Sequence, residues 1–292
     1  PMSCKAVEEG VYLIDTYALN VPRYIAVYLV AGVKGLALID SGPSSVAGRV
    51  VEAVKGLGFN VNDVKYIVLT HAHMDHAGGA GLLVRDFKEA KVVVYERVVK
   101  HLVNPVKLYE GFKSLFGEEL TSRYGFFSPV PADLIIPVKG GEMFDLGGVA
   151  LTVISTPGHT PHELSITVGS GSIFVGDAVG LYLPDADYYL PATPPGFNYE
   201  QYLKDMEFLK GLNPKKLYFA HFGSPPNPLK AIDECVKTVE EWRRYVIEKS
   251  KAGFTLEQIV NAKAEEIRVK AKLPFELAKL LTLMNVTGLT AK

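Results

Sequence analysis

The chain contains only two cysteines, Cys4 and Cys235, among its 292 residues. They form neither a disulfide framework nor the paired cysteine motif that holds zinc, and few cysteines are typical of reducing compartments. The chain also lacks the basic and then apolar opening of a secretory signal peptide. No run approaches the roughly eighteen apolar residues of a transmembrane helix. We therefore expect a cytoplasmic protein without a membrane partner.

Neither sign of charge is in excess. Lysine and arginine number 31, aspartate and glutamate 32, and the formal net charge is −1. Proteins dedicated to nucleic acids usually show a basic surplus, so no nucleic-acid partner is expected and a small-molecule substrate is favoured. Hydrophobic residues make up 48% of the chain, enough for the core of one large domain.

Histidine is also scarce, yet three of the seven histidines fall within six residues. The segment His71-Ala72-His73-Met74-Asp75-His76 follows the apolar run Tyr66–Leu69, which we interpret as a buried strand. Neutral imidazole is the commonest metal ligand, and imidazoles combined with a carboxylate suit zinc and similar divalent ions. The pattern predicts a metal site at the end of this strand.

Three further residues repeat this arrangement. His159, Asp177 and His221 each lie at or just beyond the end of a short apolar segment: Leu151–Ile154, Ile173–Val175 and Leu217–Ala220. Taken singly, each histidine would be interpreted as an ordinary histidine and Asp177 as an aspartate in a turn. Loops at strand ends carry functional sites because the strands hold them rigidly, so the repeated pattern favours one shared site.

Together with Asp40 in Asp40-Ser41-Gly42, the order of these residues resembles the signature of the metallo-β-lactamase superfamily over residues 10–225. The resemblance implies an α+β fold, a four-layer α/β/β/α sandwich with two metal ions at one edge of its sheets. It also implies one metal ion bound by His71, His73 and His159, a second bound by Asp75, His76 and His221, and Asp177 bridging both. Asp40 would either orient the ligand loop through hydrogen bonds or serve only as a turn former.

Strand and helix signals alternate through most of the chain. Residues 97–132 break the rhythm with crowded aromatics, and we interpret them as a helical insertion or lid. Residues 180–198 are expected to form a loop. Helix starts are predicted at Asn227-Pro228, at the capping box Thr255–Gln258 and near Leu273, the last helix reaching Met284. We therefore expect a catalytic domain over residues 1–225 and a helical C-terminal appendage over residues 226–292.

The resemblance implies a metal-dependent hydrolase that cleaves a small ester, thioester or lactone with a hydroxide bridging two divalent ions. Zinc is the first expectation for those ions, with iron or manganese as alternatives. Asp75 would orient the hydroxide and Tyr182 would donate a hydrogen bond to the developing oxyanion, with Tyr188 and Tyr189 as candidate substrate contacts. The appendage resembles that of hydroxyacylglutathione hydrolases (glyoxalase II), where it helps to bind the substrate; it could also form a homodimer face.

Two other activities share this order of residues. A persulfide dioxygenase would hold a single iron ion, and an RNA-processing nuclease is disfavoured by the balanced charge. The pair His162-Glu163 departs from the Gly-His pair of many relatives. We expect it to change the pocket wall, with His162 lining the pocket or hydrogen-bonded rather than binding metal. His101 has no partner motif and is interpreted as structural.

Overall fold

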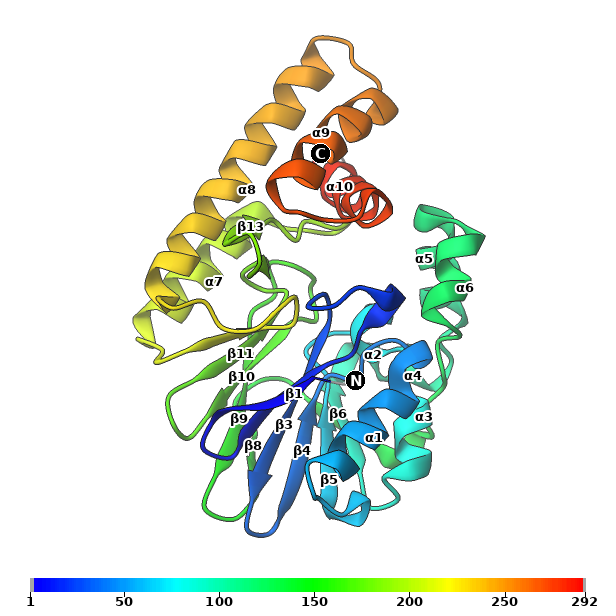
Figure 1. Ribbon diagram of the computed structural model, residues 1–292, viewed down its shortest axis with the longest axis vertical. Coiled ribbons are helices and arrows are strands. Elements are labelled where there is room, and N and C mark those ends of the chain that lie inside the picture. Colours follow the sequence, from blue (N-terminus) through cyan, green and yellow to red (C-terminus); the bar gives the residue numbers. More distant parts are fainter. Residues whose placement is uncertain (1–2, 291–292) are drawn as a thin grey trace.

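Two β-sheets face each other at the centre of the protein (Figure 1). The computed structural model describes residues 3–290, so the outermost ends of both predicted domains lie outside the described residues. The larger sheet runs in the order β1-β2-β3-β4-β5-β6-β7, antiparallel from β1 to β4 and parallel from β4 to β7. Its strands are β1 (Cys4–Glu8), β2 (Val11–Asp15), β3 (Ala26–Gly32), β4 (Gly35–Ile39), β5 (Val64–Val68), β6 (Lys91–Tyr95) and β7 (Ile135–Val138).

The smaller sheet runs in the order β14-β11-β10-β9-β8. Its strands are β8 (Met143–Asp145), β9 (Ala150–Ser155), β10 (Leu164–Val168), β11 (Ile173–Gly176) and β14 (Leu217–Phe219). The expectation of a plain loop over residues 180–198 was wrong, because β12 (Leu181–Leu183) and β13 (Tyr188–Leu190) pair there as an antiparallel hairpin. Strands of three residues are too short to show the alternation of apolar and polar residues that marks a strand in the sequence.

Helices cover the outer face of each sheet (Figure 1). Helices α1 and α3 pack on the larger sheet, and α7 and α8 lie on the outer side of the smaller one, which confirms the four-layer α/β/β/α sandwich. The helices are α1 (Ala47–Gly56), α2 (Met74–Ala77), α3 (Ala80–Asp86), α4 (Val99–Val103), α5 (Val106–Phe116), α6 (Glu118–Tyr124), α7 (Tyr199–Gly211), α8 (Pro228–Lys251), α9 (Leu256–Lys270) and α10 (Phe275–Thr290). Short 3₁₀ helices are Ala18–Asn20, Ser44–Val46, Val61–Asp63, Glu96–Val98 and Ala132–Leu134.

The central core lies between the two sheets. Successive side chains of a strand point to opposite faces, so Tyr28 of β3 packs between the sheets while its neighbour Leu29 packs under the helices. The ring of Tyr28 lies 5.2 Å from that of Phe174 on the opposing sheet. Because both faces of the larger sheet are buried, its central strands are apolar nearly throughout. This rigid sandwich holds the strand ends in place.

The C-terminal helices begin where their caps predict. The side chain of Asn227 accepts the Lys230 N–H at 3.0 Å, and Thr255 forms the predicted capping box with Gln258. Helix α10 extends beyond the expected end at Met284, because Asn285 is buried and its side-chain oxygen accepts the Thr193 N–H at 2.8 Å. The local sequence does not predict the contact between Asn285 and Thr193, so the expected end of α10 lies too early in the chain.

Helices α4 to α6 occupy much of residues 97–132, and the α5–α6 pair stands beside α10 over the strand ends (Figure 1). Helix α8 packs against β13, and α10 packs against α8 and α9. The division into two domains near residue 225 stays a prediction. Among the described residues, no helix combines the length and apolar character that crossing a bilayer requires.

Candidate metal centre

The residues that the sequence singled out converge at one edge of the sandwich. The segment after β5 carries four of them, His71 and His73 in the loop and Asp75 and His76 in the short helix α2, and the loops after β9, β11 and β14 carry one each. The sandwich therefore brings both sheets' strand ends to a single point. Among the described residues, the candidate metal-holding groups are His71, His73 and His159; His71, His76 and Asp177; and Asp75, His76 and His221.

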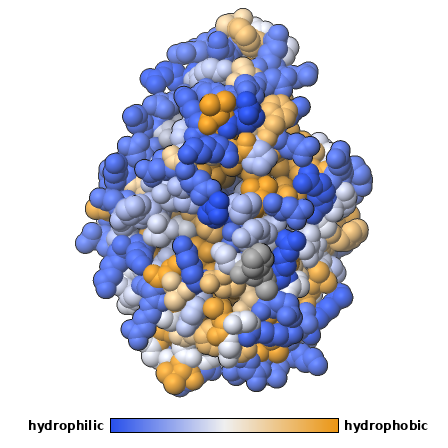
Figure 2. Space-filling view, in the orientation of Figure 1, coloured by the Kyte–Doolittle hydropathy of each residue, from blue (hydrophilic) through white to orange (hydrophobic). Residues whose placement is uncertain are grey.

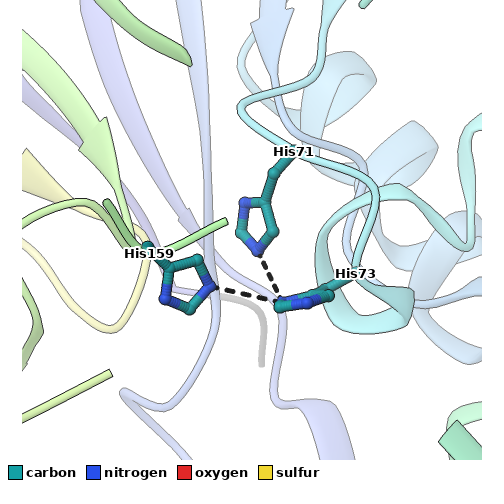
Figure 3. A group of neighbouring side chains, drawn as sticks. All are labelled: His71, His73 and His159. Carbon is teal, nitrogen blue, oxygen red and sulfur yellow. Dashed lines mark hydrogen bonds between the residues drawn. The ribbon is translucent and has the colours of Figure 1, made fainter. Parts of the chain in front are cut away.

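The first group is a triangle of imidazoles. His71 Nε2 lies 3.0 Å from His73 Nδ1, and His159 Nε2 lies 3.3 Å from the same atom. Figure 3 shows the rings of His71 and His159, which come from different strand ends, both pointing at His73. Neutral imidazoles gain little from directing three nitrogens at one another, whereas a cation between them accepts all three lone pairs.

The second group joins Asp75, His76 and His221. Asp75 Oδ2 lies 3.3 Å from His76 Nε2 and 3.2 Å from His221 Nε2. The two histidine Nε2 atoms are 3.2 Å apart. Asp75 and His76 lie in α2, which follows β5, and His221 lies just beyond the end of β14, so this group also spans both sheets.

Asp177 lies between the two groups. Its Oδ2 is 3.3 Å from His76 Nε2 and 3.7 Å from His159 Nε2, while Oδ1 is 3.7 Å from His221 Nε2. Oδ1 is buried and has no hydrogen-bond partner in the described protein. A buried carboxylate oxygen without a partner is costly, which fits a cation as its missing neighbour.

In His159 and His221, the ring nitrogen that faces away from the cluster is held by a backbone carbonyl. His159 Nδ1 lies 2.8 Å from the Ala192 carbonyl oxygen, and His221 Nδ1 lies 2.9 Å from that of Tyr24. Nδ1–H donation to these carbonyls leaves Nε2 free to face the centre. Such outer contacts fix the ring orientation and tautomer of metal-binding histidines.

Asp40 combines both of its expected roles. Its backbone has a φ of 65°, which is a turn conformation that aspartate tolerates. Its carboxylate accepts the Thr70 N–H at 2.7 Å and lies 3.1 Å from His76 Nδ1. The Thr70 hydroxyl, which bonds to Asp40, also lies 3.0 Å from His71 Nδ1. One aspartate thus orients two of the converging histidines, one of them through Thr70.

Glu163 has a role that the sequence did not reveal. Its side chain is completely buried, with Oε2 3.1 Å from His71 Nδ1 and Oε1 accepting the Asp177 N–H at 3.0 Å. The expectation that Glu163 shapes the pocket wall was therefore wrong: it lies behind the converging residues. His162 belongs to none of the candidate metal groups, but it neither lines the main cavity nor bonds through Nε2.

Burial and neighbouring charges set the protonation of the cluster. Burial, with the nearby His159 imidazole adding to it, lowers the pKa of His73 to about 3. Burial likewise lowers the pKa of His71 and His159, so these rings are neutral at pH 7 and able to bind a metal. Burial also acts against a proton on His76, but the carboxylates of Asp75 and Asp177 outweigh it and raise its pKa.

A cavity of about 250 Å³ lies over the cluster. Tyr24 and Tyr124 line it, and their hydroxyl oxygens are 2.7 Å apart. Tyr182, expected to act on an oxyanion, does not line this cavity; its hydroxyl donates to Asp187 Oδ1 at 3.1 Å. Tyr188 and Tyr189 do not line it either. This placement gives no support to a catalytic or substrate-binding role for these three tyrosines.

Comparison with known proteins identifies relatives of this chain. The model of the metallo-beta-lactamase superfamily matches residues 20–221. The metallo-beta-lactamase fold-containing protein ST1585 of Sulfurisphaera tokodaii is 33% identical over 217 residues, 73% of this chain and 78% of that protein. Its crystal structure superimposes with a TM-score of 0.69, covering 79% of this chain and 86% of that one.

Two further relatives are more distant. The metallo-beta-lactamase family protein TTHA1429 of Thermus thermophilus shares the fold, with a TM-score of 0.70 at 20% identity over 96% of this chain and 93% of that one. The coenzyme F420H2 oxidase of Methanothermobacter marburgensis is 31% identical over 62% of this chain and 43% of its own length. With the family model matching most of its length, the chain belongs to the metallo-β-lactamase superfamily.

Proposed function

We propose that this protein is a metal-dependent hydrolase of small esters, thioesters or lactones. The observation that carries the proposal is the position of Asp177 between two groups of ligand-type atoms, with its Oδ1 buried and lacking a protein partner. In this proposal, one ion is held by His71, His73 and His159, a second by Asp75, His76 and His221, and Asp177 contacts both.

The donor atoms fit zinc. They are imidazole nitrogens and carboxylate oxygens without any thiolate, a set that zinc accepts and that iron or manganese also accept. When bound, two divalent ions would polarise a substrate carbonyl and supply a water nucleophile at neutral pH. Asp75 has a side chain that is 16% exposed and lines the cavity, so it is placed to orient that nucleophile.

Tyr24 and Tyr124 supply a hydrogen-bond donor for the reacting carbonyl oxygen in this proposal. Only one of two paired hydroxyls can donate to the other, so the second O–H remains free for the cavity that both line. Burial raises the pKa of both phenols, which keeps them protonated and able to donate. A donor aimed at developing negative charge is a strong source of rate acceleration.

The second candidate function is oxidation at a single iron ion. The similarity to an oxidase favours oxidation, although the chain spans only 43% of that protein's length, and the single iron ion is the expectation from the sequence. A nuclease finds less support, because Lys107 is the only lysine or arginine among the residues that line the cavity. The identity and number of the bound metal ions distinguish the hydrolase from the iron-dependent oxidase.

The proposal is tested by metal analysis together with a substrate panel. Purified protein loaded with zinc, iron or manganese is assayed on thioesters, lactones, phosphodiesters and β-lactams, with a chelator-treated sample as control. We expect about two ions per chain and chelator-sensitive hydrolysis of the carbonyl substrates. One iron per chain, with oxygen consumption and no hydrolysis, would replace this proposal with the oxidative one.

A further inference from the structure

The walls of the cavity over the metal centre are almost entirely apolar. Helix α5 contributes one wall and α10 the opposite one, through Leu108, Phe112, Leu115, Leu281 and Met284. Figure 2 shows hydrophobic residues gathered on this face between α10 and the α5–α6 pair. One wall belongs to the helical segment 97–132 and the other to α10, the last of the C-terminal helices. Neither α5 nor α10 belongs to the two sheets or to the helices that cover them.

Most polar groups of the lining belong to the metal centre or lie beside it: His73, Asp75, Asp177, His221 and the paired tyrosines Tyr24 and Tyr124. The exception is Lys107, an exposed cation on α5. A substrate with several negative charges, such as a glutathione thioester, would find one ammonium group in this lining. An apolar chain would instead be removed from water along its whole length, which is favourable.

Gly111 is an exposed residue near the middle of α5 that also belongs to the lining of the cavity. A Cβ atom at this position would meet no atom within 4 Å. Glycine weakens a helix interior relative to alanine, because it loses more backbone freedom on folding. Because Gly111 belongs to the lining, a larger side chain at this position would take up space beside α5 that glycine leaves open.

We propose that the substrate carries an apolar acyl chain, so that this enzyme acts on esters or thioesters of medium-length fatty acids. This inference rests on the proposed hydrolase function. The carbonyl carbon must lie at the metal centre, among Asp75, Asp177 and His221, so a chain attached to it leads directly between α5 and α10. Hydrolysis adds water across the acyl bond and releases the fatty acid and the alcohol or thiol.

The first test uses p-nitrophenyl acetate, butyrate, hexanoate and octanoate with the zinc-loaded protein. Because the leaving group is constant, differences in kcat/KM report the acyl chain. Each added methylene should raise kcat/KM by about fourfold, the equivalent of ~0.8 kcal/mol, until the cavity is filled. A second series of acetate esters with alcohols of increasing length tests the other side of the ester bond. If kcat/KM rises with length only in this second series, the chain does not belong to the acyl group and the inference is overturned.

Variants locate the effect in the cavity. Gly111→Leu should lower the octanoate-to-acetate ratio of kcat/KM by tenfold or more, because the new side chain occupies the space beside α5. Gly48→Leu makes the same change on the exposed surface of α1, where a Cβ also meets nothing within 4 Å, and should leave the ratio unchanged. Thermal melting of both variants verifies folding. An unchanged ratio in folded Gly111→Leu overturns the inference.

Binding separates this inference from the proposed function. Calorimetry with butyrate, hexanoate and octanoate should show affinity rising with chain length, and Gly111→Leu should abolish the rise. If esters are hydrolysed with no chain-length dependence, the hydrolase function stands and the inference fails. If no ester is hydrolysed but the carboxylates bind with rising affinity, the apolar site stands and the hydrolase proposal fails. If the protein neither hydrolyses the esters nor binds the carboxylates, both the hydrolase proposal and the inference about the acyl chain fail.

Discussion

Glu163 Oε2 lies 3.1 Å from His71 Nδ1, on the side of the imidazole that faces away from the converging nitrogens. The other oxygen of the same carboxylate accepts the backbone N–H of Asp177. One buried side chain therefore contacts both a histidine of the first group and the aspartate that lies between the groups. Contacts of this kind set how firmly a metal site holds its ion.

Replacing Glu163 is expected to weaken metal binding. Glu163→Ala removes both contacts, and the loss of such an outer contact typically lowers metal affinity about 10–100-fold. Glu163→Gln should cost less, because its amide oxygen can still accept the Asp177 N–H. Zinc affinity is measured by competition with a chromophoric chelator. The exposed Glu89→Ala serves as control, and equal affinity in all four proteins would contradict a positioning role for Glu163.

Asp177→Ala is expected to reduce the zinc content at both groups, because its carboxylate lies between them. His221→Ala removes a side chain of the second group only, so it should leave about one ion per chain. Elemental analysis of dialysed protein gives the metal content of each variant. Asp177→Ala retaining two ions with full activity would show that the aspartate does not bridge.

Removing the Tyr124 hydroxyl is expected to slow hydrolysis. Tyr124→Phe breaks the pair with Tyr24, so the remaining hydroxyl loses its fixed direction. Loss of a donor to developing negative charge lowers kcat by about 10²–10³. Tyr182→Phe tests the role expected from sequence and should leave kcat near its original value, since that hydroxyl bonds to Asp187. The opposite ranking of the two variants would restore Tyr182 as the donor.

Gly111→Ala should raise the thermal stability of the protein. Alanine is favoured over glycine in a helix interior by about 0.5–1 kcal/mol, and the added methyl group meets no atom within 4 Å. Calorimetric melting should therefore show a higher Tm than the original protein. A lower Tm would mean that α5 needs the conformational freedom of glycine at this position.

The convergence of the candidate metal-binding residues could be predicted from sequence because each of these side chains follows a strand signal. His159, Asp177 and His221 needed only the rule that loops at strand ends carry sites. Tyr24 and Tyr124 had no such signal, since they are 100 residues apart and meet only when α6 closes over the chain before β3. The contact between the two hydroxyls depends on the tertiary fold, and no local sequence pattern predicts it.

Tyr182 follows Asp177 closely along the chain but does not line the cavity. Successive side chains of β12 point to opposite faces, so Leu181 lines the cavity while Tyr182 packs against Phe219 and Tyr189. A prediction based on distance from Asp177 along the chain cannot separate these two faces when the strand itself is not recognised. The hairpin of β12 and β13 lay within the segment interpreted as a loop.

Anomalous diffraction from crystals of the zinc-loaded protein tests the central claim most directly. The arrangement of the two groups predicts two zinc peaks about 3.5–4 Å apart, on either side of the Asp177 carboxylate. Peaks elsewhere, or none at saturating zinc, would contradict the proposal that these histidines and aspartates form a dinuclear metal centre.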